Sequence, residues 1–151
     1  MSKIKFISIL TVVILIAIYF YGIEEREDSS KKTTAKKIRI YEADYQKWWC
    51  EKNHGEREVV LSDGTRSDCV TSDFAIEVDF SKKWAEAIGQ SLHYARLTKK
   101  NAGILLIVNT SNDKKHHQRL TNTISYYNLP IKVWTINKNE LLRINKPNKA
   151  N

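Results

Sequence analysis

Residues 68–95 contain acidic side chains whose types and spacing suit divalent-metal chemistry. Asp68 comes shortly before an alternating apolar segment, and that segment itself carries Glu77 and Asp79. Side chains two positions apart in a strand project from one face, about 6.5–7 Å from each other along it. If this strand pairs with the preceding one as a hairpin, the three carboxylates converge on one point. Oxygen ligands of this type suit Mg²⁺, Mn²⁺ or Ca²⁺ rather than zinc, so the segment predicts a metal site.

The three acids also have a plainer interpretation as surface residues. On an ordinary half-buried strand, Glu77 and Asp79 would simply face solvent. Burying like charges together is costly unless a cation neutralises them. If Asp79 points away from Asp68 and Glu77, the interpretation as a metal site fails.

The helix expected after this strand carries a polar strip. Glu86, Gln90 and Tyr94 follow one another at intervals of four residues and share one side of the helix, and His93 lies beside them. If the helix packs on the sheet beyond the acids, Gln90 is placed to orient a metal-bound water or a phosphate.

Two lysines stand at the start of the same helix. Lys82 and Lys83 follow Asp79 by three and four residues, which lets either one reach back towards the acids. Each is suited to clamp a phosphate or to activate water. Taken separately, each also has the character of an ordinary solvated lysine.

The elements that must position these residues alternate between helices and strands. We expect a helix at 41–54, strands at 56–61, 67–71 and 74–80, a helix at 82–100, a strand at 102–110, a helix at 113–128 and a strand at 130–137. Asp63 and Gly64 mark a hairpin turn between the first two strands, and Asn112 or Asp113 is the expected cap of the last helix. The order α-β-β-β-α-β-α-β predicts an α/β domain with a mixed sheet and helices packed against it.

This order, with Asp68 on the second strand and "IEVDF" on the third, resembles the PD-(D/E)XK nuclease superfamily, which has the restriction-endonuclease-like fold. "GQSLHYA" also matches the Gln-x-x-x-Tyr motif of one exonuclease-like branch, with Gln90 and Tyr94 at its two positions. The resemblance covers residues 41–136 and extends to a family of small, often exported bacterial proteins. Each motif alone is short, and their joint order and spacing carry the resemblance.

The resemblance implies a function for each matching residue. Asp68 and Glu77 would be metal-binding acids, and Gln90 and Tyr94 would support the site from the helix. Asp79 departs from the pattern, because the superfamily has a lysine there that helps to activate water and to stabilise the charged transition state.

The missing lysine leaves two outcomes open. Either Lys82 or Lys83 takes over its function, or the domain has lost activity. Glu58 on the first strand or Glu51 on the first helix would supply a further carboxylate.

An active site would hydrolyse phosphodiester bonds of DNA or RNA, with one or two Mg²⁺ (or Mn²⁺) ions held by the three acids. The alternatives are a catalytically inactive nuclease-fold domain that binds nucleic acid or a protein partner, and a structural envelope protein with surface acids.

The composition narrows the choice of partner. The formal net charge of +8 is compatible with a polyanion such as nucleic acid. The sequence lacks a P-loop, a dinucleotide-binding glycine fingerprint and a serine-nucleophile elbow.

His116 and His117 are adjacent and point in different directions on a helix, so they predict a basic surface rather than a metal pair. Four tryptophans fit core packing better than base stacking: Trp48, Trp49, Trp84 and Trp134.

The N-terminal residues predict a membrane segment. Residues 4–23 carry a single charge, Lys5, and have about the length that crosses a bilayer as a helix. No small-x-small cleavage site follows, which favours a retained signal anchor over a cleaved signal peptide. The expected parts are the transmembrane anchor at 1–23, a polar linker at 24–37, the nuclease-like domain at 38–140 and a basic C-terminal tail at 141–151.

The chain has two cysteines, Cys50 and Cys69, and both lie beside expected regular structure. An even number in a small domain allows a disulfide, and two buried thiols are the alternative. Lysines on both sides of the apolar segment leave the positive-inside rule divided. The cysteines favour a soluble domain outside the cytoplasm, periplasmic or exported, and tethered to the membrane.

Overall fold

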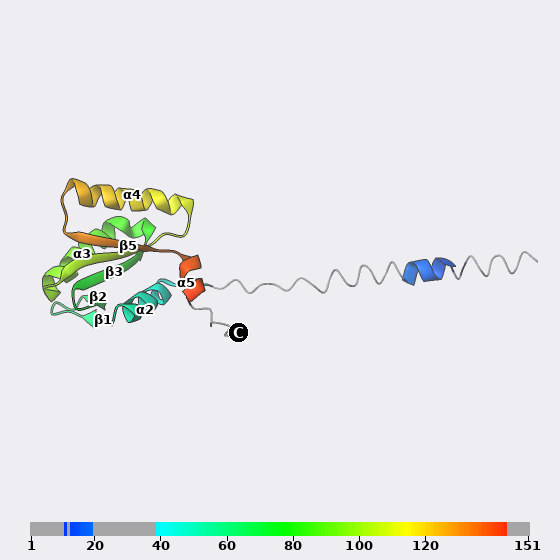
Figure 1. Ribbon diagram of the computed structural model, residues 1–151, viewed down its shortest axis with the longest axis horizontal. Coiled ribbons are helices and arrows are strands. Elements are labelled where there is room, and N and C mark those ends of the chain that lie inside the picture. The colour runs from blue at the N-terminus through cyan, green and yellow to red at the C-terminus, as the bar shows by residue number, and fades with distance from the viewer. Residues whose placement is uncertain (1–10, 12, 20–38, 145–151) are drawn as a thin grey trace, which may run out of the picture. The chain divides into compact units, whose positions relative to one another are not determined.

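The computed structural model describes residues 11, 13–19 and 39–144 of the 151-residue chain. The chain divides into two units, residues 1–38 and residues 39–151. The labelled strands and helices of Figure 1 all belong to the second unit.

The first unit is described only in part. Residues 13–19 are helical, and their side chains are exposed. Within the described ranges, no helix has the length and apolar character that a membrane span requires. Most of the predicted anchor at 1–23 and the whole linker at 24–37 lie outside the described residues, as does 145–151 of the predicted tail.

The second unit is built on a five-stranded sheet whose strands lie in sequence order (Figure 1). The strands are β1 (Glu56–Val60), β2 (Arg66–Val70), β3 (Phe74–Phe80), β4 (Asn101–Ile107) and β5 (Ile131–Ile136). β1, β2 and β3 pair antiparallel, whereas β3, β4 and β5 pair parallel. Since hairpins link the antiparallel strands and helical crossovers link the parallel ones, the predicted mixed sheet is confirmed.

Helices cover both faces of this sheet. They are α2 (Glu42–Lys52), α3 (Trp84–Thr98), α4 (Ser111–Tyr126) and α5 (Lys138–Ile144), with a short 3₁₀ turn, η1 (Ser81–Lys83), before α3. α3 and α4 lie against one face, and α2 and α5 lie against the other (Figure 1). The predicted α/β class, with helices packed against a mixed sheet, is therefore confirmed.

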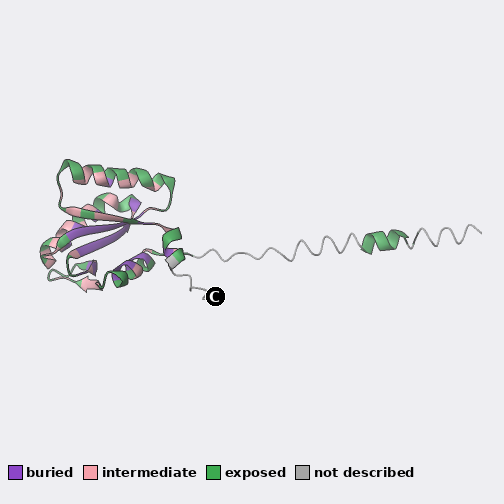
Figure 2. Cartoon of the chain, in the orientation of Figure 1, coloured by how far each residue is buried: buried purple, intermediate pink, exposed green. Residues whose placement is uncertain are grey.

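Successive side chains of a strand point to opposite faces of the sheet, and one hydrophobic cluster forms on each face, under the helices that cover it. On the α2 side, Ile76 and Val78 of β3 pack with Leu105 of β4 and Trp49 of α2. The cluster on the opposite side consists of Ala87, Ile104, Leu106 and Leu120. The central strands are buried along most of their length (Figure 2), and this explains the apolar sequence of β4 after its exposed first residue, Asn101.

A disulfide joins Cys50 of α2 to Cys69 of β2, and both residues are fully buried. Their Cα atoms are 5.8 Å apart, and 19 positions separate them in the sequence. Gly55 passes close to this bridge, since a Cβ at that position would lie 2.5 Å from the Cys69 Sγ and 2.8 Å from the Cys50 Sγ. Glycine therefore lets the chain that leaves α2 enter β1 beside the crosslink. Of the two interpretations of the cysteines, the disulfide is the one found.

The start of α4 differs from its prediction. The helix begins at Ser111 and is capped by Thr110, whose hydroxyl accepts a hydrogen bond from the Asp113 amide at 3.3 Å. The Asp113 carboxylate accepts in return from the Thr110 amide at 2.8 Å, which completes a capping box. The cap predicted at Asn112 or Asp113 is therefore wrong, because Asp113 occupies the reciprocal position of the box.

The domain also continues past the predicted start of the tail. α5 covers Lys138–Ile144, and its Leu141 is only 1 % exposed and packs in the cluster under α2. Residues 141–144 therefore belong to the folded domain rather than to a basic tail. A helix of seven residues offers too few turns for an apolar period to be recognised in the sequence.

Reduction of the disulfide should lower the free energy of unfolding by about 3 kcal/mol, because the crosslink restricts the unfolded chain. Urea titrations of the full-length protein, with and without a thiol reductant, measure this difference. A Cys50→Ala/Cys69→Ala double variant is the control, and the reductant should leave its midpoint unchanged. Equal midpoints for oxidised and reduced wild-type protein would contradict the expectation.

Candidate functional site

Glu77 and Asp79 are buried on the side of β3 that faces α3. Their side chains are 6 % and 1 % exposed. Ile76 and Val78 pack under α2, so strand alternation turns both carboxylates towards the opposite face. The interpretation of Glu77 and Asp79 as solvent-facing residues is therefore wrong.

Asp68 joins these two acids because β2 and β3 separate at its position. The last ladder pair before the separation is Cys69 with Ile76. Beyond it, the Oδ2 of Asp68 accepts a hydrogen bond from the Val78 amide at 2.8 Å, so a side chain takes the place of a strand carbonyl. Val78 lies between the two acids of β3, and this contact therefore keeps all three carboxylates in one neighbourhood.

Gln46 of α2 connects Asp68 to a fourth carboxylate. It is 4 % exposed, and its amide nitrogen donates to the Asp68 carbonyl oxygen at 2.8 Å and to the carboxylate of Glu58. In the β1–β2 pairing, the residues before and after Glu58 pair with those after and before Asp68, so Glu58 lies opposite Asp68. The Nε of Arg66 lies 2.7 Å from the Glu58 carboxylate. Glu51 is exposed on α2, so Glu58 is the one of the two candidate carboxylates that lies beside the site.

The backbone at Glu58 is strained. Its φ of 57° lies in the left-handed region, which a non-glycine residue enters at a cost of about 1–2 kcal/mol. Backbone strain of this kind collects at functional sites, where the surrounding structure holds it in place. Here the hydrogen bond from Gln46 and the ion pair with Arg66 hold the side chain.

Glu42 is a site residue that sequence reasoning missed. It lies in the first turn of α2, and its negative charge acts on both Glu77 and Asp79 and raises their pKa values. A signal was present in the sequence, because Glu42 precedes Gln46 by four residues and therefore shares its helix face. Neither residue was recognised, since nothing local shows which face of the helix meets the acids.

Of the two lysines considered, Lys83 is the one that reaches the acids. Its Nζ lies 3.2 Å from the Oδ1 of Asp79, while its side chain stays 53 % exposed. Lys82 is exposed one position earlier in η1. Both lysines also line an open cavity of about 500 Å³ beside Phe80.

Tyr94 of α3 lies close enough to Glu77 and Asp68 for their charges to act on it, and Gln90 is its hydrogen-bond partner. Tyr94 is 6 % exposed; burial raises its pKa, as does the nearby charge of Glu77, while a hydrogen bond with the Gln90 side chain lowers it. In the described part of the chain, the Oε1 of Gln90 is buried without a hydrogen-bond partner. The rest of the polar strip lies elsewhere, because Glu86 is exposed and the Nε2 of His93 lies 2.7 Å from the Oδ2 of Asp63.

Crowding of buried carboxylates raises their pKa values. Burial, followed by the charges of Asp68 and Asp79, raises the pKa of Glu77 from 4.5 to about 9. Burial raises the pKa of Asp68 to about 6, against the hydrogen bond from Val78. Burial also raises the pKa of Asp79, although Lys83 opposes the shift. Glu77 is therefore protonated at neutral pH when no cation is bound.

The donor set has the chemistry of a site for a hard divalent cation. Carboxylate and amide oxygens are the preferred ligands of Mg²⁺ and Mn²⁺, and the Oδ2 of Asp79 is buried without a partner among the described residues. The side chains are not arranged around an ion, however. Among residues 11, 13–19 and 39–144, no group of three His, Cys, Asp or Glu side chains is arranged to hold a metal.

Comparison of the chain with protein-family models, with curated proteins and with solved structures returned no match. The functions of its residues therefore rest on the geometry of the site.

A Glu77→Gln variant should be more stable than the wild type at high pH in the presence of EDTA. The pKa of Glu77 is higher in the folded protein than in the unfolded chain. The stabilisation that its protonated form gives the folded state is therefore complete below the unfolded pKa of 4.5 and is lost as pH rises towards about 9. Wild-type stability should fall across this window by up to about 1.4 kcal/mol per pH unit, and the variant should lack this slope.

Urea titrations at a series of pH values between 4 and 9 measure the two slopes. Glu51→Gln is the matched control, since it makes the same chemical change at an exposed position, and its profile should follow that of the wild type. Parallel profiles for wild type and Glu77→Gln would show that Glu77 ionises normally.

Proposed function

We propose that the domain hydrolyses phosphodiester bonds in nucleic acid with a divalent metal ion, Mg²⁺ or Mn²⁺, held by Asp68, Glu77 and Asp79. The observation that carries the proposal is the burial of Glu77 and Asp79 beside the partly buried Asp68, with the pKa of each of the three raised above its ordinary value. A bound cation would favour their ionised forms and remove the cost of their crowding. The net charge of +8 suits a polyanionic substrate.

The arrangement of elements supports the finer fold assignment that goes with this function. A helix is followed by three antiparallel strands, and a helical crossover then leads to a parallel fourth strand. This is the order that the resemblance to the PD-(D/E)XK superfamily implies for the restriction-endonuclease-like fold. Asp68 on the second strand and Glu77 on the third would fill the two acidic positions of that superfamily.

The metal ion would polarise the phosphate and generate hydroxide from bound water. Lys83 supplies a positive charge against Asp79, the position where the superfamily pattern has lysine, and suits the stabilisation of developing negative charge. The free Oε1 of Gln90 is an acceptor, so it suits orientation of a water rather than of a phosphate oxygen. Tyr94 orients the Gln90 amide through their hydrogen bond.

A second candidate function is a catalytically inactive domain of the same fold that binds nucleic acid or a protein partner. Two observations favour it. The acids of the described residues do not form a closed metal-binding group, and Glu77 is protonated at neutral pH without a cation. The ion pair between Lys83 and Asp79 then acts as an internal neutralisation of the site.

The location belongs to the same proposal. A buried disulfide is typical of proteins folded in an oxidising compartment, which supports a periplasmic or exported domain. The apolar residues 4–23 supply the proposed membrane anchor.

The function is tested by incubating the full-length protein with single-stranded and duplex DNA and with RNA, in Mg²⁺, Mn²⁺ or EDTA. We expect cleavage that needs the metal and that falls at least about a hundredfold in Asp68→Asn and in Glu77→Gln. Lys83→Met should lower the rate similarly, whereas Lys82→Met, the matched control from the same turn, should retain it. Cleavage that persists in both acid variants would reject this site, and binding without any cleavage would favour the inactive domain.

A further inference from the structure

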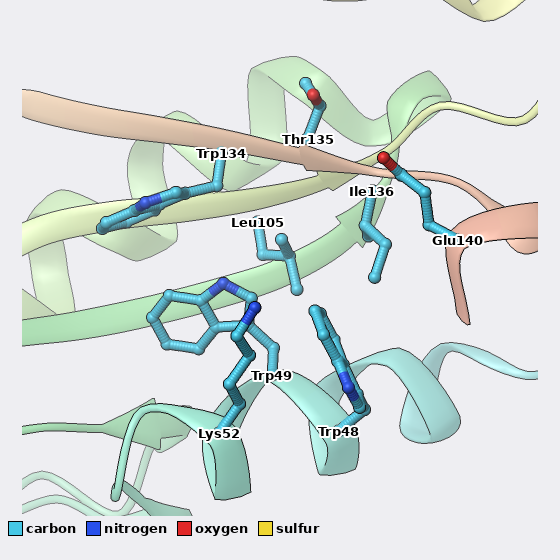
Figure 3. Close-up of a pocket in the computed structure, with 8 residues that line it drawn as sticks. All are labelled: Trp48, Trp49, Lys52, Leu105, Trp134, Thr135, Ile136 and Glu140. Carbon is cyan, nitrogen blue, oxygen red and sulfur yellow. The ribbon is translucent and has the colours of Figure 1, made fainter. Parts of the chain in front are cut away.

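A groove of about 300 Å³ lies on the α2 side of the sheet (Figure 3). Three indole rings surround it, from Trp48 and Trp49 of α2 and Trp134 of β5, and we call it the tryptophan groove. Leu105 lies behind the rings, and the side chain of Lys52 extends in front of Trp49 in this view. The volume is sufficient for one flat ring of the size of a nucleobase.

The groove lies where α2 meets β4, β5 and the start of α5. Trp134 lies beside Leu105 in the β4–β5 register, and Trp49 is 6 % exposed and meets Trp134 edge to face with ring centroids 5.2 Å apart. Trp48 and Trp134 pack against the core but are only partly buried. Core packing therefore accounts for Trp49 and leaves aromatic surface of the other two rings accessible.

Positive charges flank these rings. The Nζ of Lys52 lies 4.9 Å from the ring centroid of Trp48, and the Nζ of Lys132 lies 4.9 Å from that of Trp134. The acidic side chain in the lining, Glu140, is held in the turn that begins α5, where its carboxylate accepts from the Asn137 amide at 2.9 Å. Aromatic faces between ammonium groups suit a flat apolar ring attached to anionic groups, which is the chemistry of a nucleotide in a strand.

α2 connects this groove to the acid cluster. Glu42 at its start acts on Asp79, while Trp48 and Lys52 lie 6 and 10 residues further along. At 1.5 Å per residue these separations are about 9 and 15 Å along the helix.

We propose that the tryptophan groove binds an unstacked base of single-stranded nucleic acid, with the neighbouring phosphates at Lys52 and Lys132. The inference rests on the proposed function and specifies its substrate as a single strand. A base in a duplex is paired and stacked on its neighbours, so it cannot enter the groove, whereas a base in a single strand is free to stack on indole.

Binding is measured on the full-length protein in EDTA, by the anisotropy of labelled oligonucleotides, so that no cleavage occurs. The probes are an oligothymidylate, a chain of equal length without bases, and a duplex. We expect the oligothymidylate to bind at least tenfold more tightly than the chain without bases, because stacking adds to phosphate contacts. Equal affinity for these two probes, or equally tight binding of the duplex, would overturn the proposal.

Two substitutions locate the binding site. Trp48→Leu keeps an apolar side chain against the core and should weaken oligothymidylate binding about tenfold, with little effect on the chain without bases. Lys52→Glu should weaken both probes and reduce the dependence on salt. Lys47→Glu is the matched control, since it makes the same charge change at an exposed position of the same helix. Equal losses in Lys52→Glu and Lys47→Glu would overturn the assignment of the groove.

The outcomes separate this inference from the proposed function. If cleavage needs the metal, Asp68 and Glu77, but binding is the same in Trp48→Leu, the groove is not the binding site and the proposed enzymatic function stands. If binding depends on the bases and on Trp48, but no metal supports cleavage, the groove is the binding site and the enzymatic function is rejected. Unchanged near-ultraviolet circular dichroism, apart from the lost indole signal, shows that Trp48→Leu is folded.

Discussion

The hydrogen bond from the Val78 amide to the Asp68 carboxylate determines how the acidic site fits into the sheet. At this position β2 no longer pairs with β3, so no carbonyl of β2 accepts from the Val78 amide. The Asp68 carboxylate accepts instead, and the buried amide keeps a hydrogen bond. Gln46 then donates to the backbone carbonyl of the same aspartate. Asp68 is consequently part of the sheet as well as of the site, and its position depends on three separate elements.

The second constraint is charge. Carboxylates that are almost fully enclosed by the fold favour their protonated forms, and the half-exposed Lys83 neutralises Asp79 in part. This lysine comes from the turn after β3 rather than from the strand, so its side chain arrives from the solvent side of Asp79. A lysine at position 79 would instead project from the strand into the interior. The positive charge of Lys83 therefore lies on the outer side of the site, and Asp79 places an acid inside it.

Features that depend on local pattern were predictable from the sequence, and features that depend on docking were not. The alternation of β3 and the four-residue spacing of Gln90 and Tyr94 were correctly assigned, because each is a property of one element. Glu42 and Gln46 were missed because their helix meets the acids only after α2 has packed on the sheet. The left-handed backbone of Glu58 has no glycine or asparagine to signal it. The side chain of Glu58 is held by the tertiary contacts with Gln46 and Arg66.

The disulfide has a consequence for when the acidic site is assembled. Cys50 belongs to the helix that supplies Glu42 and Gln46, and Cys69 is the residue next to Asp68. The crosslink therefore joins the two parts of the chain that contribute opposite sides of the acid cluster. In a newly made chain with free thiols, only noncovalent packing holds these parts together. Oxidation of Cys50 and Cys69 therefore fixes these two parts of the chain to each other, and the acid cluster is held more firmly after that step than before it.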